Sequence, residues 1–190
     1  MGMGTEVITR LTYDEFRQLP DDGKRYELIH GAVHVSPSPN VKHQRTHSNL
    51  FRSLGPHVSA HRLGWLFSAP LDVTLALDTA VQPDLLFISA ARADIILDSY
   101  IAGAPDLVVE ILSPSTAAHD RGTKLALYAQ AGVPWVWFFD PDARTVETFR
   151  LEGGKYYVDS ILAGNQTLTS PMFPGWQLPL HELFDFRTSF

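Results

Sequence analysis

The chain has 190 residues, of which 45% are hydrophobic and 19% charged, a composition typical of one soluble globular domain spanning residues 1–190. It contains no cysteine, no apolar run of about 18 residues and no N-terminal signal-peptide core, so we expect a cytoplasmic protein without disulfides, thiolate chemistry or a membrane span. The formal net charge of -6 argues mildly against a protein that coats nucleic acid, because phosphate affinity depends on cationic side chains.

The first predicted elements are a short helix and a hairpin. In LTYDEFRQLP, Thr12 is a suitable N-cap and a proline ends the helix. The stretch RYELIHGAVHVSP alternates around His30-Gly31, which predicts two antiparallel strands. Glu27 lies in the first of these strands and shares a face with Ile29.

A longer helix is expected from Asn40, with a break or kink at Gly55-Pro56. Its inner side carries the apolar side chains and two histidines: Leu50, Phe51, Leu54, Val58, His43 and His47. Its outer side carries Lys42, Arg45 and Arg52. Because residues 28–71 contain no Asp or Glu, we expect these three cations to contact nucleic acid; an ordinary solvated helix is an equally weighted alternative.

Strands dominate the rest of the pattern. We expect strands in 64–70, 71–77 and 81–89, a helix in 91–100, buried strands in 107–112 and 134–140, and a closing antiparallel meander in 144–151, 155–162 and 165–173. Between the two buried strands, Ser115 or Thr116 caps a crossover helix that ends at Gly132. This order predicts a mixed α/β sheet, with a core at about 11–140 and a β-rich tail at about 144–183.

Glu110 is the most unusual residue of this pattern, because it lies inside the apolar strand LVVEIL. A buried carboxylate costs several kcal/mol unless a cation compensates it. Asp84 in VQPDLLFI and Glu27 are the other carboxylates expected to enter the same sheet. Three carboxylates would repel one another unless a cation bound between them, and hard oxygen ligands suit Mg²⁺ or Mn²⁺.

The following helix offers a second cation. Asp120, Lys124 and Tyr128 recur at i, i+4 and i+8 and therefore form one stripe. If this stripe faces the sheet, Lys124 reaches the carboxylates. The alternative is an exposed Asp120–Lys124 pair worth only about 0.3–0.5 kcal/mol.

These segments together resemble the Uma-two endonuclease family, within the PD-(D/E)XK nuclease superfamily. The resemblance lies in RYELIHG, VQPDLLFI, PDLVVEILSPST, the stripe and GVPWVWFFDP, and covers about 11–183. It implies a restriction-endonuclease-like α/β core in which Asp84, Glu110 and the carbonyl of Ile111 hold the metal, with Glu27 completing or bordering the site. The sequence departs from the superfamily formula at Leu112, where a lysine is expected, and the resemblance points to Lys124 for that role.

The implied activity is metal-dependent hydrolysis of phosphodiester bonds in DNA by a homodimer. Asp84, Glu110, Glu27 and Lys124 would be its catalytic residues, with Lys124 orienting the attacking water or stabilising charge on the phosphorane-like transition state. His43, Asp72, Asp120 and Tyr128 are expected as accessory groups. For His43 a hydrogen-bonded histidine in a half-buried helix, and for Asp72 a solvated aspartate near a turn, are the alternatives.

Three other interpretations carry less weight. The pair His43 and His47 has the spacing of a zinc hydrolase, but HQRTH lacks the glutamate that acts as general base. The serines of SPST are explained by helix capping, and the aromatic strand PWVWFFD by the core or a dimer surface. The stronger alternative is a catalytically silent nuclease-fold protein that acts as a dimerisation or binding module, which the acidic net charge and the missing lysine favour.

Overall fold

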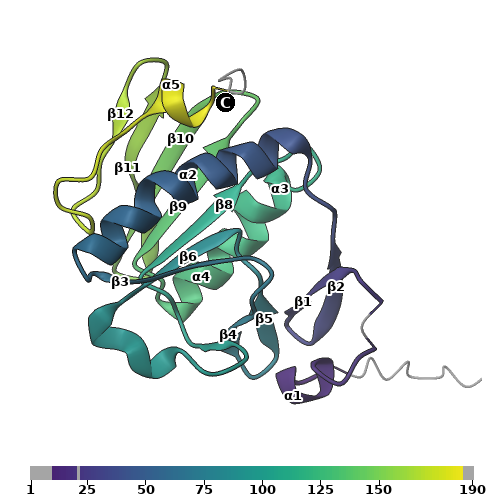
Figure 1. The fold of residues 1–190 in the computed structure, drawn as a ribbon. Coiled ribbons are helices and arrows are strands. Elements are labelled where there is room, and N and C mark those ends of the chain that lie inside the picture. The colour runs from purple at the N-terminus through teal and green to yellow at the C-terminus, as the bar shows by residue number, and fades with distance from the viewer. Residues whose placement is uncertain (1–9, 21, 186–190) are drawn as a thin grey trace, which may run out of the picture.

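The computed structural model describes residues 10–20 and 22–185, which form two β-sheets, a two-stranded ribbon and the helices around them (Figure 1). The five-stranded sheet has the order β2-β1-β5-β4-β7, with β1 (Arg25–Ile29), β2 (Ala32–Ser36), β4 (Val73–Ala76), β5 (Thr79–Val81) and β7 (Ile101–Ala102). The six-stranded sheet has the order β11-β10-β9-β8-β6-β3, with β3 (Gly64–Ser68), β6 (Leu85–Ser89), β8 (Leu107–Ile111), β9 (Trp135–Asp140), β10 (Thr145–Glu152) and β11 (Lys155–Ala163). The predicted mixed α/β fold is therefore confirmed.

The N-terminal elements form as their sequence predicts. Thr12 caps α1 (Tyr13–Phe16) in a capping box with Glu15. Strands β1 and β2 pair antiparallel around a tight turn in which both His30 (φ 49°) and Gly31 (φ 78°) have left-handed backbone angles. A turn of this kind matches the twist of the two flanking strands. Glu27 points from β1 toward the interior and is only 3% exposed.

Helices cover both faces of the six-stranded sheet (Figure 1). On one face, α2 (Val41–Ala60) buries Leu50, Leu54 and Val58 against strands β6, β8 and β9. On the other face, the chain leaves β8 into a continuous helical segment and returns as β9, which pairs parallel with β8. That segment consists of α3 (Ala117–His119), the π-helical turn η2 (Asp120–Lys124) and α4 (Leu125–Ala131), and it ends at Gly132 with a φ of 80°. This crossover places Lys124 beside Glu110, which belongs to β8.

The structure differs at least in part from four predictions about local structure. Helix α2 runs through Pro56 without a break, since its neighbouring turns are held by core packing. The helix expected in 91–100 is only the 3₁₀ segment η1 (Ala90–Ile95). Thr116 occupies the N-cap position of the crossover helix but makes no side-chain cap hydrogen bond; its hydroxyl lies 3.0 Å from that of Ser113. In the tail, β12 (Thr167–Leu168) pairs with β13 (Leu178–Pro179), which leads into α5 (Leu180–Leu183), and does not continue the meander.

The aromatic strand β9 belongs to the core, as one of the two interpretations expected: Trp137, Phe138 and Phe139 are at most 1% exposed. The edges of the six-stranded sheet are β11 and β3. None of the helices in the described part of the chain is long and apolar enough to cross a membrane.

Candidate functional site

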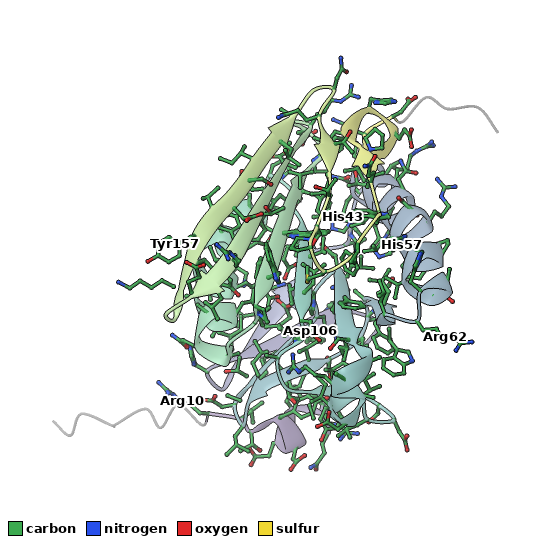
Figure 2. All side chains as sticks on the ribbon, turned by 90° about the vertical axis from the view of Figure 1, so that its left-hand side faces the viewer. Arg10, His43, His57, Arg62, Asp106 and Tyr157 are labelled. Atoms are coloured by element: carbon green, nitrogen blue, oxygen red, sulfur yellow. The ribbon has the colours of Figure 1, made fainter. Side chains whose placement is uncertain are left out.

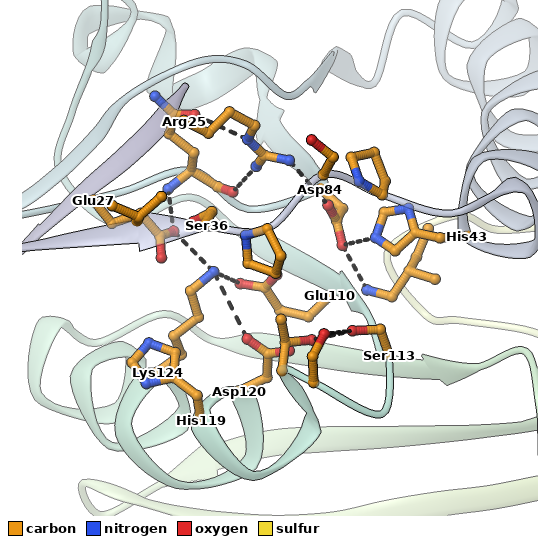
Figure 3. Close-up of a pocket in the computed structure, with 18 of the residues that line it drawn as sticks. Arg25, Glu27, Ser36, His43, Asp84, Glu110, Ser113, His119, Asp120 and Lys124 are labelled. Atoms are coloured by element: carbon orange, nitrogen blue, oxygen red, sulfur yellow. Dashed lines mark hydrogen bonds and ion pairs between the residues drawn. The ribbon is translucent and has the colours of Figure 1, made fainter. Parts of the chain in front are cut away.

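A cavity of about 350 Å³ lies where the two sheets meet (Figure 3). Its walls come from β1 and β2, the loop into α2, the link between β5 and β6, the end of β8 and the start of the crossover helix. The predicted residues Glu27, Asp84, Glu110, Asp120 and Lys124 all line it. The expectation that the carboxylates enter one sheet was wrong, because Glu27 belongs to the five-stranded sheet and Glu110 to the six-stranded sheet. The site therefore joins two sheets.

Lys124 lies at the centre of the buried charges. Its ammonium nitrogen is 2.9 Å from Oε1 of Glu27, 3.0 Å from Oε1 of Glu110 and 3.9 Å from Oδ1 of Asp120. Lys124 is 5% exposed. The stripe therefore faces the sheet, as predicted, and the alternative of an exposed Asp120–Lys124 pair is excluded. Burial alone would lower the pKa of Lys124, but the charges of Glu110, Glu27 and Asp120 raise it above its ordinary value. The ammonium group stays protonated.

Glu110 accepts two hydrogen bonds at the same oxygen, from the Lys124 ammonium group and, at 2.5 Å, from the hydroxyl of Tyr128. Burial in strand β8 raises the pKa of Glu110 to about 8, and the charges of Asp120, Asp84 and Glu27 add to this effect against the opposing charge of Lys124. Burial likewise raises the pKa of the Tyr128 hydroxyl, which stays a hydrogen-bond donor. The positive charge of one lysine therefore does not fully compensate the negative charges of the carboxylates around it.

Asp84 lies in the link where the chain passes from β5 to β6. The antiparallel register Leu85↔Val109 continues to place Asp84 opposite Glu110, which directs both side chains to the same face. Oδ2 of Asp84 accepts the backbone N–H of Ile111 at 2.8 Å and lies 3.0 Å from Nε2 of His43 on α2 (Figure 3). Burial opposes ionisation of Asp84, but the His43 contact and the Ile111 hydrogen bond together hold its pKa below the usual value.

A π-helical turn carries two residues of the stripe. Asp120 and Lys124 are the first and last residues of η2 and both are buried, whereas Arg121 points outward to Glu147. A π turn widens the helix locally, and such turns are frequent at functional sites. Burial raises the pKa of Asp120 as it does that of Glu110.

Of the remaining predicted residues, the structure places Asp72 outside this cluster and His43 inside it. Asp72 does not line the cavity. Its carboxylate accepts hydrogen bonds from Tyr13 at 2.9 Å and from Gln82 at 2.8 Å. Its connection to the cavity is therefore indirect, through Gln82, which lines it. His43 does face inward and contacts Asp84, but no zinc-binding arrangement with His47 is present in the described chain. Burial lowers the pKa of the His47 imidazole.

The three cations of α2 lie outside the cavity, as their pattern predicts. Lys42 is paired with Asp142, and Arg52 donates a hydrogen bond to Asn49. Arg45 is half-buried and makes no ion pair with any described residue.

Arg25 and Gln82 line the site but were not predicted from the sequence. Arg25 precedes Glu27 by two positions on β1, so the strand period places both on one face. Gln82 precedes Asp84 by two positions, and its backbone N–H donates to Oε1 of Glu27 at 2.8 Å. A basic residue two positions from a buried acid was the available signal for Arg25; for Gln82 the sequence carried none.

The oxygens of the cavity fit a divalent cation that completes its shell with water. No group of three or more histidine, aspartate or glutamate side chains in the described ranges is arranged to hold a metal by itself. However, Oε2 of Glu110 has no hydrogen-bond partner among the described residues, and Oδ1 of Asp84 has only the Arg25 guanidinium, 3.9 Å away. Mg²⁺ is commonly bound by one or two carboxylates and several waters. Oε2 of Glu110 and Oδ1 of Asp84 would be the two carboxylate ligands of such an ion.

The comparisons with known proteins concern the fold and the family of the chain. No curated protein matches the chain. A solved structure described as a putative nuclease belonging to DUF820 from Anabaena variabilis ATCC 29413 matches with a TM-score of 0.76 and 25% sequence identity, over 92% of this chain and 97% of that one. The fold is therefore that of a restriction-endonuclease-like core. The model of the Uma2 family, described as "Putative restriction endonuclease", matches residues 13–181, and the chain belongs to this family.

Proposed function

We propose that the protein is a divalent-metal-dependent endonuclease that hydrolyses phosphodiester bonds in DNA. The family gives the nuclease class. The observation that carries the proposal is the convergence of Asp84 and Glu110, from neighbouring segments of the six-stranded sheet, with Lys124 from the crossover helix in one open cavity. Buried carboxylates with perturbed pKa values in a cavity are typical of catalytic sites.

Asp84 and Glu110 would hold Mg²⁺ or Mn²⁺, with the Ile111 carbonyl as the further predicted ligand. The metal would polarise a phosphate oxygen and lower the pKa of a bound water. The His43 side chain and the Ile111 N–H fix one oxygen of Asp84 and leave the other toward the cavity. Tyr128 and Lys124 likewise bind one oxygen of Glu110 and leave its other oxygen without a hydrogen bond from a described residue.

The charge of Lys124 opposes the effect of burial on the pKa of Glu110 and so favours the charged carboxylate that a cation would bind. The predicted second role of Lys124, orienting the attacking water or stabilising the transition state, stays a prediction, as does a catalytic role for Glu27. The cytoplasmic location also stays a prediction.

The basic side of α2 is the proposed path of the DNA backbone. Lys42, Arg45 and Arg52 follow one side of the helix, whose N-terminal end carries His43 into the cavity. Phosphates lying along these residues would continue toward Asp84. The affinity of such a surface would depend strongly on salt.

We also propose a homodimer that pairs through β11. This nine-residue edge strand exposes Tyr157 (55%), Val158 (55%) and Ile161 (62%), and Tyr157 projects outward from it (Figure 2). An exposed apolar edge strand favours pairing with a second chain. Sedimentation of wild type and Ile161→Glu tests this; a wild-type monomer, or a variant that still dimerises, contradicts it.

The test of the nuclease activity is cleavage of plasmid and single-stranded DNA with Mn²⁺ or Mg²⁺, together with calorimetric metal titration. Wild type, Asp84→Asn, Glu110→Ala and Lys124→Ala are compared with Asp98→Asn, a control at an exposed carboxylate that lies outside the cavity. We expect cleavage by wild type and the control only, with metal affinity lost in Asp84→Asn and Glu110→Ala.

One observation favours the second candidate, a catalytically silent binding module. Lys124 already contacts Glu27 and Glu110, so the fold compensates part of their charge without a metal. In that case the wild type would neither bind Mn²⁺ nor cut DNA, and Glu110 would be a structural carboxylate.

A further inference from the structure

We propose that Arg25 forms an oxyanion subsite of the cavity, where its guanidinium group binds the non-bridging oxygens of the substrate phosphodiester. This inference rests on the proposed nuclease function and assigns the substrate contact to a cation that the sequence pattern did not select. It separates two tasks: Lys124 compensates the carboxylates, and Arg25 contacts the phosphate.

The hydrogen-bond donors of Lys124 are already directed at carboxylates of the protein. An ammonium group has three N–H donors. Two of them meet Glu27 and Glu110 at 2.9 and 3.0 Å, the third side faces Asp120 at 3.9 Å, and the side chain is 6% exposed. A phosphate that took a bond from Lys124 would have to remove it from a buried carboxylate, which is costly.

Arg25 is placed differently. Its Nε donates to the side-chain oxygen of Gln82 at 3.3 Å, and its Nη2 donates to the backbone oxygen of the same residue at 2.9 Å (Figure 3). These two bonds fix the plane of the guanidinium group. Of its five N–H donors, the two on Nη1 and one on Nη2 have no hydrogen-bond partner in the described ranges. The side chain is 26% exposed and lines the cavity.

The position of the free donors relates them to the proposed metal site. Nη1 of Arg25 lies 3.9 Å from Oδ1 of Asp84, which is too long for a hydrogen bond but close enough that a ligand of Arg25 would lie beside Asp84. A planar guanidinium fork fits two oxygens of one phosphate. Arg25 and Lys124 are the described cavity residues with a permanent positive charge, so Arg25 is the one that can meet an anionic substrate.

The test compares wild type, Arg25→Gln and Arg25→Lys with Arg150→Gln, a control at an exposed arginine that is paired with Glu152 on β10. A fluorescent DNA duplex is titrated in EDTA over a series of NaCl concentrations, so that binding is measured without cleavage. Metal-dependent cleavage and Mn²⁺ calorimetry are measured on the same preparations, and thermal melting checks that each variant is folded.

We expect Arg25→Gln to reduce the slope of log affinity against log salt by about 0.9, the value for one lost phosphate contact. Its kcat/KM should fall about 100-fold or more, as for other oxyanion contacts. Arg25→Lys should keep the salt slope and recover part of the activity, because lysine retains the charge but not the fork. Mn²⁺ affinity and the control should stay within about twofold of wild type.

Other outcomes overturn the inference in distinguishable ways. An active Arg25→Gln with an unchanged salt slope would make Arg25 a structural partner of Gln82. A variant that loses Mn²⁺ binding would show that Arg25 acts through Asp84. A wild-type protein that neither binds nor cuts DNA removes the proposed function itself, and the inference with it.

Discussion

The ammonium nitrogen of Lys124 lies 2.9 Å from Oε1 of Glu27, and this buried ion pair connects the crossover helix of one sheet to the first strand of the other. Both side chains are at most 6% exposed. The contact therefore contributes to the assembly of the two sheets as well as to the chemistry of the cavity between them.

Replacing Lys124 by methionine should destabilise the protein strongly. The substitution preserves much of the side-chain volume but leaves Glu27, Glu110 and Asp120 without their cation, which typically costs about 3–5 kcal/mol for a buried pair. Urea unfolding followed by tryptophan fluorescence measures the change, with the exposed Lys155→Met as control. A loss below about 1 kcal/mol would mean that the carboxylates are protonated or otherwise compensated.

The contribution of Glu110 to the stability of the metal-free protein should fall as the pH rises from about 4.5 to about 8. Burial raises the pKa of Glu110 from 4.5 to about 8, so the folded state binds its proton more tightly than the unfolded state throughout that interval. The contribution of Glu110 to the free energy of unfolding is thus fully present below the pKa that Glu110 has in the unfolded state. It is lost once the pH exceeds the pKa that Glu110 has in the folded state.

Glu110→Gln removes this titration and should melt higher than wild type in EDTA at pH 8, by about 2 °C or more, but not at pH 5. Melting curves at both pH values measure the difference. Glu152→Gln on the exposed end of β10 is the control. If wild type and Glu110→Gln showed the same dependence on pH, Glu110 would ionise without penalty in the folded state.

Removing the contact between His43 and Asp84 should weaken metal binding without abolishing it. His43 contacts the oxygen of Asp84 that the Ile111 N–H also binds, and therefore fixes the orientation of the predicted ligand. Loss of such a supporting group typically lowers metal affinity about 10–100-fold. Mn²⁺ calorimetry on His43→Ala, with the exposed His61→Ala as control, tests this. Equal affinities would leave His43 without a role in positioning Asp84.

On the basic side of α2, Arg45→Gln should weaken DNA binding more than Lys42→Gln. Lys42 is already paired with Asp142, whereas Arg45 has no ion pair with a described residue and its charge is free for a phosphate. Each full phosphate contact contributes about 0.9 to the salt slope. Anisotropy titrations at several salt concentrations compare the two variants. The opposite order would mean that the pair with Asp142 does not keep Lys42 from a phosphate.

Local sequence determined much of the framework of the site. Five apolar residues around Glu110 require a covered strand, and the buried carboxylate then requires a cation nearby. The i, i+4, i+8 spacing brought Lys124 and Tyr128 to one side of the helix that follows, where both contact Glu110. These inferences succeeded because helix and strand periods are fixed by backbone geometry over a few residues.

Only the tertiary structure decided how separate segments meet. The division into two sheets, the register that sets Asp84 opposite Glu110, the distance of Asp72 from the cavity and the exposed donors of Arg25 all depend on pairings between residues far apart in the chain. Strand periodicity states which face a side chain occupies but not which strand lies beside it. The sequence alone therefore determined that Glu110 needs a charged partner, whereas long-range packing decided which residues surround it and which of their atoms remain free.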